Sequence, residues 1–136
     1  MRFMMIVKGD SASEAGVMPS KELVETMTAY NEALVKSGVL LAAEGLHPTS
    51  KGFKKRIVGD RHTIVDGPFT EAKEIVAGFW LLQVKSREEM VAWAMRCPAP
   101  VEVRQVFDFA DFPAELQEAA ASETELRAQI ERQHQS

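Results

Sequence analysis

DGPFTEAKE, residues 66–74, is the stretch that decides how this chain folds, and it lies between two strand-like runs. The first run is HTIV at 62–65, and the second is a longer apolar run at 75–84. Asp-Gly is a strong turn dipeptide, and the proline that follows fixes φ and removes a backbone donor. The stretch therefore predicts a turn that brings four charged side chains to one end of a sheet.

The composition is that of one domain with one hydrophobic core. The 136 residues are 46% hydrophobic, so folding requires neither a metal nor a disulfide. The single cysteine, Cys97, excludes an internal disulfide framework, and we interpret it as a small buried hydrophobe. The 16 basic and 20 acidic residues give a net charge of -4, which argues against a nucleic-acid partner.

The apolar run at residues 1–8 is too short for a secretion signal or a membrane span. Its continuously apolar part, 3–7, is typical of a strand covered on both faces. We therefore expect a first strand here, a cytoplasmic protein and no membrane partner.

The first half of the chain has the pattern strand, helix, strand. Residues 9–19 are small and polar, which predicts a loop, and Ser20 is a good helix cap. A helical stripe follows and stops before Gly38, which we expect to be the residue just past the helix end. The stripe consists of Leu23, Met27, Tyr30 and Leu34. The run at 39–46 then predicts the second strand.

The second half repeats this pattern after a pair of strands at 53–58 and 62–65 and the strand at 75–84. Ser86 and Glu89 form a capping box in which each side chain bonds the other residue's backbone N–H. The helix that follows carries an apolar face and ends before Pro98, and alternation predicts a strand at 101–109. Its face consists of Met90, Trp93, Ala94 and Cys97. A third helix is expected from Asp111, with a polar tail at 123–136 that frays or lies on a partner.

The order β-α-β-β-β-α-β predicts an α+β fold, a ferredoxin-like sheet with helices on one face and an extra C-terminal helix. The other sheet face would be apolar and uncovered, so a two-fold homodimer, sheet against sheet, is the simplest expectation. We place one domain at 1–112 and a C-terminal helix and tail at 113–136.

The charged turn allows two interpretations. In the structural one, Asp66 caps local N–H groups and Phe69 fills a gap in the core. In the functional one, Asp66 is a general base or ligand anchor, and Glu71 and Lys73 supply counter-charges and ligand contacts. Burial would decide between the two, and burial does not follow from the sequence.

Other candidates for chemistry are scattered along the chain. His47 is the best proton shuttle, since imidazole exchanges protons near neutral pH, whereas His62 and His134 fit exposed positions. Arg104 either neutralises Glu102 on the same strand face or binds a ligand carboxylate. We find no spacing of a metal site, no phosphate loop and no dinucleotide fingerprint, so we expect no metal and no cofactor.

Several short segments, in the right order, resemble the YCII-related or DGPF family over most of residues 1–110. The segments are MMIV at 4–7, GLHP at 45–48, DGPFTEAKE at 66–74, GFW at 78–80, Trp93-Ala94, and EVR at 102–104. The nine-residue motif is the specific one among them. The resemblance implies a ferredoxin-like protomer, a dimeric α/β barrel and a cleft between sheet and helices.

The resemblance also sets out two functional hypotheses. Some relatives of this barrel class are enzymes on small organic molecules, such as lactone isomerases and dehydrochlorinases, and they use a His/Asp pair. His47 occupies a position that the family pattern leaves free, so the pair is not visibly reproduced. The first hypothesis is a protein that binds or converts a small polar organic molecule by acid/base chemistry near Asp66. The alternative is a non-catalytic regulatory or partner-binding module, linked to an extracytoplasmic-function sigma factor.

Overall fold

The computed structural model describes residues 1–69 and 75–135 of the chain. They belong to two compact units, Met1–Gln105 and Val106–Ser136, which we describe separately. The domain boundary expected between residues 112 and 113 stays a prediction. The first unit contains both sheets and the helices between their strands, so the predicted α+β class is confirmed.

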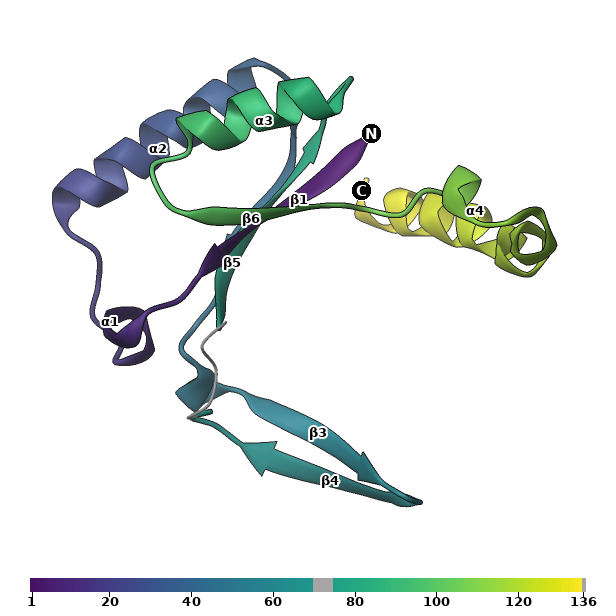
Figure 1. Ribbon diagram of the computed structural model, residues 1–136, viewed down its shortest axis with the longest axis horizontal. Helices are drawn as coiled ribbons and strands as arrows, with labels where there is room; N and C mark the ends of the chain where they lie inside the picture. The colour runs from purple at the N-terminus through teal and green to yellow at the C-terminus, as the bar shows by residue number, and fades with distance from the viewer. Residues whose placement is uncertain (70–74, 136) are drawn as a thin grey trace. The chain divides into compact units, whose positions relative to one another are not determined.

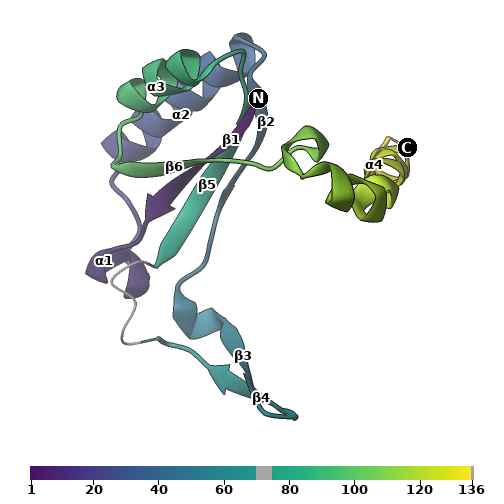
Figure 2. The same cartoon turned by 45° about the vertical axis from the view of Figure 1, so that its right-hand side comes forward.

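The first unit is built on a four-stranded sheet with the order β2-β5-β1-β6, and every neighbouring pair is antiparallel. The strands are β1 (Arg2–Lys8), β2 (Leu40–Gly45), β5 (Val76–Gln83) and β6 (Val101–Gln105). Helices α2 (Lys21–Lys36) and α3 (Arg87–Arg96) both lie over one face of it (Figure 1, Figure 2). This arrangement is the predicted ferredoxin-like one. Within one chain the sheet is open, so the expected barrel requires a second copy and stays a prediction.

The core lies between this sheet and the two helices. Alternate residues of β1, Phe3 and Met5, point into it, as do Trp80 and Leu82 of β5. Met5, Leu34, Leu82 and Met90 are the fully buried side chains. The helix face of the sheet is therefore closed by packing, and the opposite face receives no helix of this unit.

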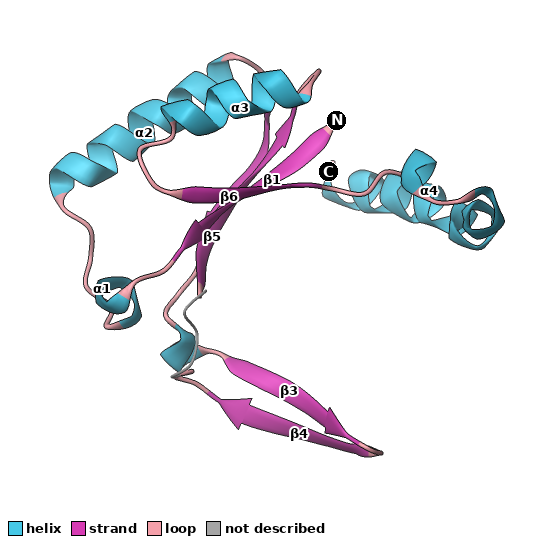
Figure 3. Cartoon of the chain, viewed as in Figure 1, coloured by secondary structure: helices cyan, strands magenta, loops and turns pink. Residues whose placement is uncertain are grey.

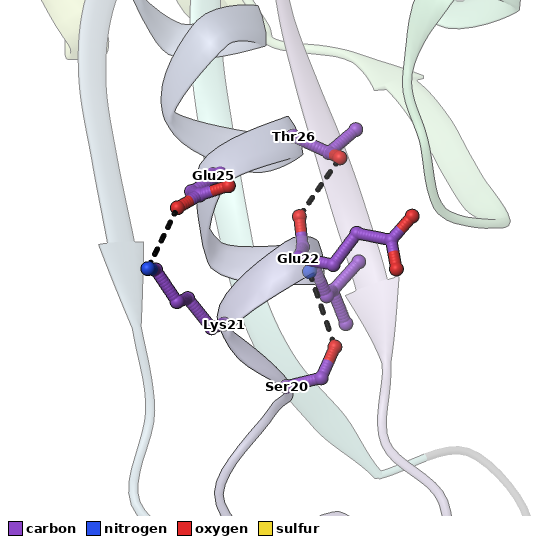
Figure 4. A network of polar contacts seen from close by, with 6 residues as sticks. Ser20, Lys21, Glu22, Glu25 and Thr26 are labelled. Carbon is purple, nitrogen blue, oxygen red and sulfur yellow. Dashed lines mark hydrogen bonds and ion pairs between the residues drawn. The ribbon is translucent and has the colours of Figure 1, made fainter.

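Helix α2 begins and ends as its sequence predicts. The Ser20 hydroxyl accepts the Leu23 N–H at 3.1 Å, Lys21 pairs with Glu25 at 3.8 Å (Figure 4), and Gly38 has φ +75°. The predicted stripe is confirmed for Met27, Tyr30 and Leu34 but is wrong for Leu23, which is 42% exposed. Residues 21–26 are all exposed, because the first turns of α2 do not pack on the sheet.

Strand β2 contains a β-bulge that determines which of its side chains point to the core. The register against β5 shifts between Leu40 and Ala42, so Leu41 is left out of the pairing and is 49% exposed. Because of this extra residue, Leu40 and Ala43 both pack against the core although they are three apart. Beyond the bulge, Gly45 pairs with Gly78 of β5.

Helix α3 departs from its prediction at the cap. The Ser86 hydroxyl accepts the Glu89 N–H as expected, but the Glu89 carboxylate accepts the N–H of Lys85 instead of that of Ser86. The Ser86 backbone is extended, as is usual at an N-cap. The predicted face packs into the core, and burial raises the pKa of the Cys97 thiol at the helix end.

Strands β3 (Phe53–Val58) and β4 (Arg61–Asp66) pair only with each other and form a second, two-stranded sheet (Figure 3). Gly59, with φ +60°, makes the tight turn between them. All residues of β3 and β4 except Val65 are exposed. The predicted strand pair is thus confirmed, but it lies apart from the main sheet.

The segment at 9–19 is not all loop. Ser11–Glu14 forms a short helix, α1, because the Asp10 carboxylate accepts the Ser13 N–H at 2.8 Å while the Ser13 hydroxyl accepts the Asp10 N–H. The Ser13 N–H also lowers the pKa of Asp10. This capping box was not recognised in the sequence.

The second unit corrects two expectations. Strand β6 ends at Gln105 instead of 109, since the Asp111 carboxylate accepts the Asp108 N–H and begins a 3-10 turn, Phe109–Asp111. Helix α4 therefore starts after Pro113 and not at Asp111, and it spans Ala114–His134. The tail at 123–136 is helical through His134, where an ion pair at 3.0 Å joins Arg132 to Glu125.

The core generates a prediction at Tyr30, the single tyrosine of the chain. Its side chain is 6% exposed and its hydroxyl donates to the Trp93 carbonyl at 2.8 Å. Burial raises the pKa of Tyr30 to about 12. Tyrosinate absorbance should therefore appear near pH 12 in the folded protein and near pH ~10 in urea.

Because the folded pKa is the higher one, the contribution of Tyr30 to stability is complete below pH ~10 and is lost as the pH rises through about 12. The free energy of unfolding of Tyr30→Phe, measured in urea, should therefore not show this loss of stability as the pH rises. A native titration centred near pH ~10 would contradict the prediction.

Candidate functional site

Two cavities adjoin at the β2 end of the main sheet. The larger, the outer groove, has a volume of about 660 Å³, and the smaller, the inner chamber, about 280 Å³. Gly45 and Ala77 line both, so the two cavities meet at these small residues. Their sizes are on the scale of pockets that hold small organic molecules, ~300–1,000 Å³.

The inner chamber exists because two paired strands lack side chains at the same point. Gly45 lies opposite Gly78 in register, and Val7, Ala43 and Trp80 surround them. A Cβ on Gly78 would approach the Glu44 carbonyl oxygen to 2.8 Å, whereas a Cβ on Gly45 would meet nothing within 4 Å. The space above Gly45 is thus the open interior of the chamber.

Helix α2 supplies an uncharged polar group of the chamber, the amide of Asn31. The Trp80 indole N–H donates to Asn31 Oδ1 at 2.7 Å, which fixes the orientation of the amide. No described residue accepts a hydrogen bond from the Asn31 NH₂ group, and Asn31 lines the chamber with Met27. The two N–H groups are therefore available to a ligand.

Asn31 was missed by sequence reasoning, although a signal was present. It follows Met27 by four positions and precedes Leu34 by three, so it lies on the apolar stripe of α2. A polar residue within such a stripe needs a buried partner, and Trp80 is that partner.

The outer groove contains the predicted residue His47. The Leu46 N–H donates to the Ala77 carbonyl at 2.8 Å, which ends the pairing of β2 with β5 and directs the next residue into the groove wall. His47 is exposed there, and Ser13, Glu14 and Lys51 line the same groove. An imidazole, an ammonium and hydroxyl groups thus border one cavity.

Thr49 connects this groove to the motif loop. Its N–H and hydroxyl donate to the two oxygens of the Glu14 carboxylate at 2.9 and 2.5 Å, and its hydroxyl accepts the Phe69 N–H at 3.1 Å. The Gly67 N–H donates to the Gly52 carbonyl at 3.0 Å. The described part of the motif loop therefore anchors the base of the hairpin to α1.

The described motif side chains, Asp66, Pro68 and Phe69, line neither cavity. Asp66 ends β4, is exposed, and receives no hydrogen bond from any described residue, neither from local N–H groups nor from His47. Phe69 is half-buried, with the Lys54 ammonium 4.4 Å from its ring centre, and does not belong to the core cluster. Glu71 and Lys73 lie outside the described residues. Their roles, and that of Asp66 as a base, stay predictions.

Arg104 also lies away from these cavities in the same chain. It is exposed on β6, three strand spacings from β2 in the sheet order, or roughly 14 Å. Glu102 pairs with Lys8 at 3.9 Å, not with Arg104. His62 is exposed on β4, and His134 ends α4.

Two kinds of feature are absent from residues 1–69 and 75–135. No three His, Cys, Asp or Glu side chains in this part of the chain come together as metal ligands would. None of its helices combines the length and the apolar character that a bilayer crossing requires.

Comparisons with known proteins identify a family and include a structural likeness. The family model described as the YCII-related domain matches residues 1–110. Among solved structures, 5-chloro-2-hydroxyhydroquinone dehydrochlorinase from Burkholderia phenoliruptrix, in complex with 2,5-dihydroxybenzoquinone, is 16% identical with a TM-score of 0.44. The alignment covers 79% of this chain and 94% of that one. No curated protein matches the sequence.

The contact between the motif loop and Thr49 yields a prediction. A Cβ on Gly67 would overlap the Thr49 carbonyl oxygen, while a Cβ on Gly52 would lie 3.6 Å from that same atom. Gly67→Ala should lower the free energy of unfolding by about 1–3 kcal/mol, the usual cost of overpacking. Gly52→Ala is the matched control and should stay within ~0.5 kcal/mol. Equal urea midpoints for the two variants would show that the close approach does not constrain the loop.

Proposed function

Because the chain belongs to the YCII-related family, we propose that it binds a small polar organic molecule in the outer groove and that His47 exchanges a proton with it. One observation carries this proposal: an exposed imidazole lines a groove that adjoins an apolar chamber. A ligand can place its apolar part in the chamber and its polar part beside His47. Histidine is the side chain best suited to take up or release a proton near neutral pH.

The groove also has the groups that would orient such a ligand. Lys51 brings a positive charge, which favours an anionic or strongly polar substituent, and Ser50 brings a hydroxyl group. The Glu14 carboxylate is already held by Thr49, so it is not a free base in the groove. His47 is therefore our choice for the proton-carrying group.

We further propose a homodimer, formed through the sheet face opposite the helices. The register places Met4 and Ile6 of β1 and Phe79 and Leu81 of β5 on this face, which no helix of the first unit covers. A contiguous apolar face of this kind is typical of an interface. In the proposal, Asp66, Phe69 and Arg104 contribute to ligand binding only through a second copy, since none of them lines the outer groove or the inner chamber.

The remaining partners and the location belong to the proposal as well. The net charge of -4 disfavours nucleic acid, and we include neither a membrane nor a cofactor. We place the protein in the cytoplasm, where the single Cys97 stays a thiol.

A regulatory, non-catalytic module is the second candidate, supported by the hairpin. Phe53, Ile57 and Ile64 share one face of it by register and are 66%, 62% and 59% exposed. A two-stranded sheet has little stability alone, so such a face favours a protein partner, an extracytoplasmic-function sigma factor in our alternative.

Light scattering should give twice the mass of the chain if the dimer forms. Leu81→Arg should yield a folded monomer, since this side chain lies on the face opposite the core. Val35→Arg, a change of similar size at a 63% exposed site on α2, should leave the dimer intact. A monomeric wild-type protein would exclude the sheet-to-sheet arrangement.

A thermal-shift screen of small carboxylates and phenols should identify a ligand, and its conversion can then be followed. His47→Gln should reduce conversion by about 100-fold or more, because acid/base groups contribute on this scale, while binding changes little. His62→Gln, at an exposed site on β4, is the control. Asp66→Asn should keep the dimer and weaken binding. Unchanged conversion in His47→Gln, or no ligand in the screen, would favour the regulatory module.

A further inference from the structure

We propose, on the basis of the function above, that the inner chamber binds the ring of an uncharged carbonyl compound and that Asn31 donates a hydrogen bond to its oxygen. The carbonyl class covers ketones, lactones and quinones. The chamber and the outer groove meet at Gly45 and Ala77, so the rest of the same molecule extends toward His47.

The size and surface of the chamber select a ring. Its volume of about 280 Å³ exceeds that of an apolar cavity of ~150 Å³ that holds benzene. Gly45 and Gly78 leave its floor flat, and the walls are the indole of Trp80, the thioether of Met27 and the side chain of Val7. Aromatic and methionine side chains favour flat, polarizable ligands.

Asn31 selects an acceptor. Its Oδ1 accepts the Trp80 N–H at 2.7 Å, while its two N–H donors have no acceptor among the described residues. A ligand that brings an oxygen acceptor satisfies a donor that would otherwise lose hydration on binding. A hydrocarbon of the same shape leaves that donor unpaired.

The charge of the lining selects an uncharged acceptor. Among the described residues that line the chamber, Glu44 is the charged one, and it is an acid. No cation of this lining balances a ligand carboxylate, so an anion loses hydration without a partner. A carbonyl oxygen accepts from Asn31 at a much lower cost.

Trp80 acts as a positioning residue for Asn31. It is 7% exposed and packs edge-on against Tyr30, with ring centres 5.7 Å apart. This packing holds the indole N–H in one place, and the N–H in turn holds the amide. The donors of Asn31 are thus directed by the core and not by the ligand.

The test uses 1-indanone as the carbonyl probe and indane, which lacks the oxygen, as the matched hydrocarbon. Calorimetry on the full chain should show that the wild type binds 1-indanone more tightly than indane. Asn31→Leu should weaken 1-indanone binding by about tenfold or more and leave indane binding within about threefold. Glu32→Leu, at the exposed neighbouring position, is the control for a change in α2.

Gly45→Val offers a second route that does not depend on Asn31. A Cβ at this position meets nothing within 4 Å, so the larger side chain should occupy the chamber and remove binding of both probes without lowering the unfolding temperature. In wild-type protein, the side-chain amide signals of Asn31 should shift on addition of 1-indanone and not of indane.

The chamber and the His47 function can fail separately. If the wild type binds neither probe, or if Asn31→Leu and Gly45→Val bind 1-indanone as the wild type does, the chamber is not the recognition pocket. His47→Gln should bind 1-indanone normally, because His47 lines the groove and not the chamber. Normal conversion by His47→Gln, with the Asn31 and Gly45 effects present, overturns the proton transfer alone.

Discussion

The register of β2 against β5 is the constraint on which both cavities depend. Side chains alternate between sheet faces, so a slip of one residue exchanges the two faces of a strand. The bulge at Leu41 uses this rule, since one extra residue lets Leu40 and Ala43 face the same core. The same register brings Gly45 opposite Gly78, where the chamber opens, and ends β2 just before His47. Without the bulge, the core would lose a side chain and the chamber its floor.

The described part of the DGPF motif, residues 66–69, does not line the two cavities in which we place the chemistry. Its glycine lies against Thr49 so closely that no side chain fits, and the Phe69 N–H bonds the Thr49 hydroxyl. Thr49 is bound in turn by Glu14 of α1. The described part of the motif thus links three chain segments at the edge of the outer groove. The contacts of this part of the motif are therefore made by its backbone, whereas the Asp66 carboxylate receives no hydrogen bond from a described residue.

Much of the fold follows from the sequence because local chemistry and periodicity agree. The caps at Ser20 and Ser86, the glycine after α2 and the apolar run at 3–7 all indicate the elements that form. The prediction was wrong where hydrogen bonds between a side chain and a nearby backbone N–H determine the local conformation. This is the case for Asp10 with Ser13 and for Asp108 with Asp111. Such capping boxes depend on geometry over three residues, which apolar periodicity does not detect.

The candidate site was harder to predict than the fold. His47 could be chosen from its chemistry, but its groove is formed by α1, a helix that the sequence reading treated as loop. The periodicity of α2 does not indicate Asn31, because it identifies the apolar positions of the stripe and not a polar residue among them. The chamber itself is a consequence of absent side chains on two strands distant in sequence, and only pairing brings Gly45 to Gly78.

The walls of the chamber differ in how freely they can change. Trp80 is part of the core and touches Tyr30, whose hydroxyl binds the backbone of α3, so a substitution there disturbs the packing of both helices. Gly45 and Ala77 also line the chamber, but they are small and lie outside the core cluster. Within this fold, the size of the accepted molecule can therefore evolve at Gly45 and Ala77 while the core residues, and the folded state with them, are preserved.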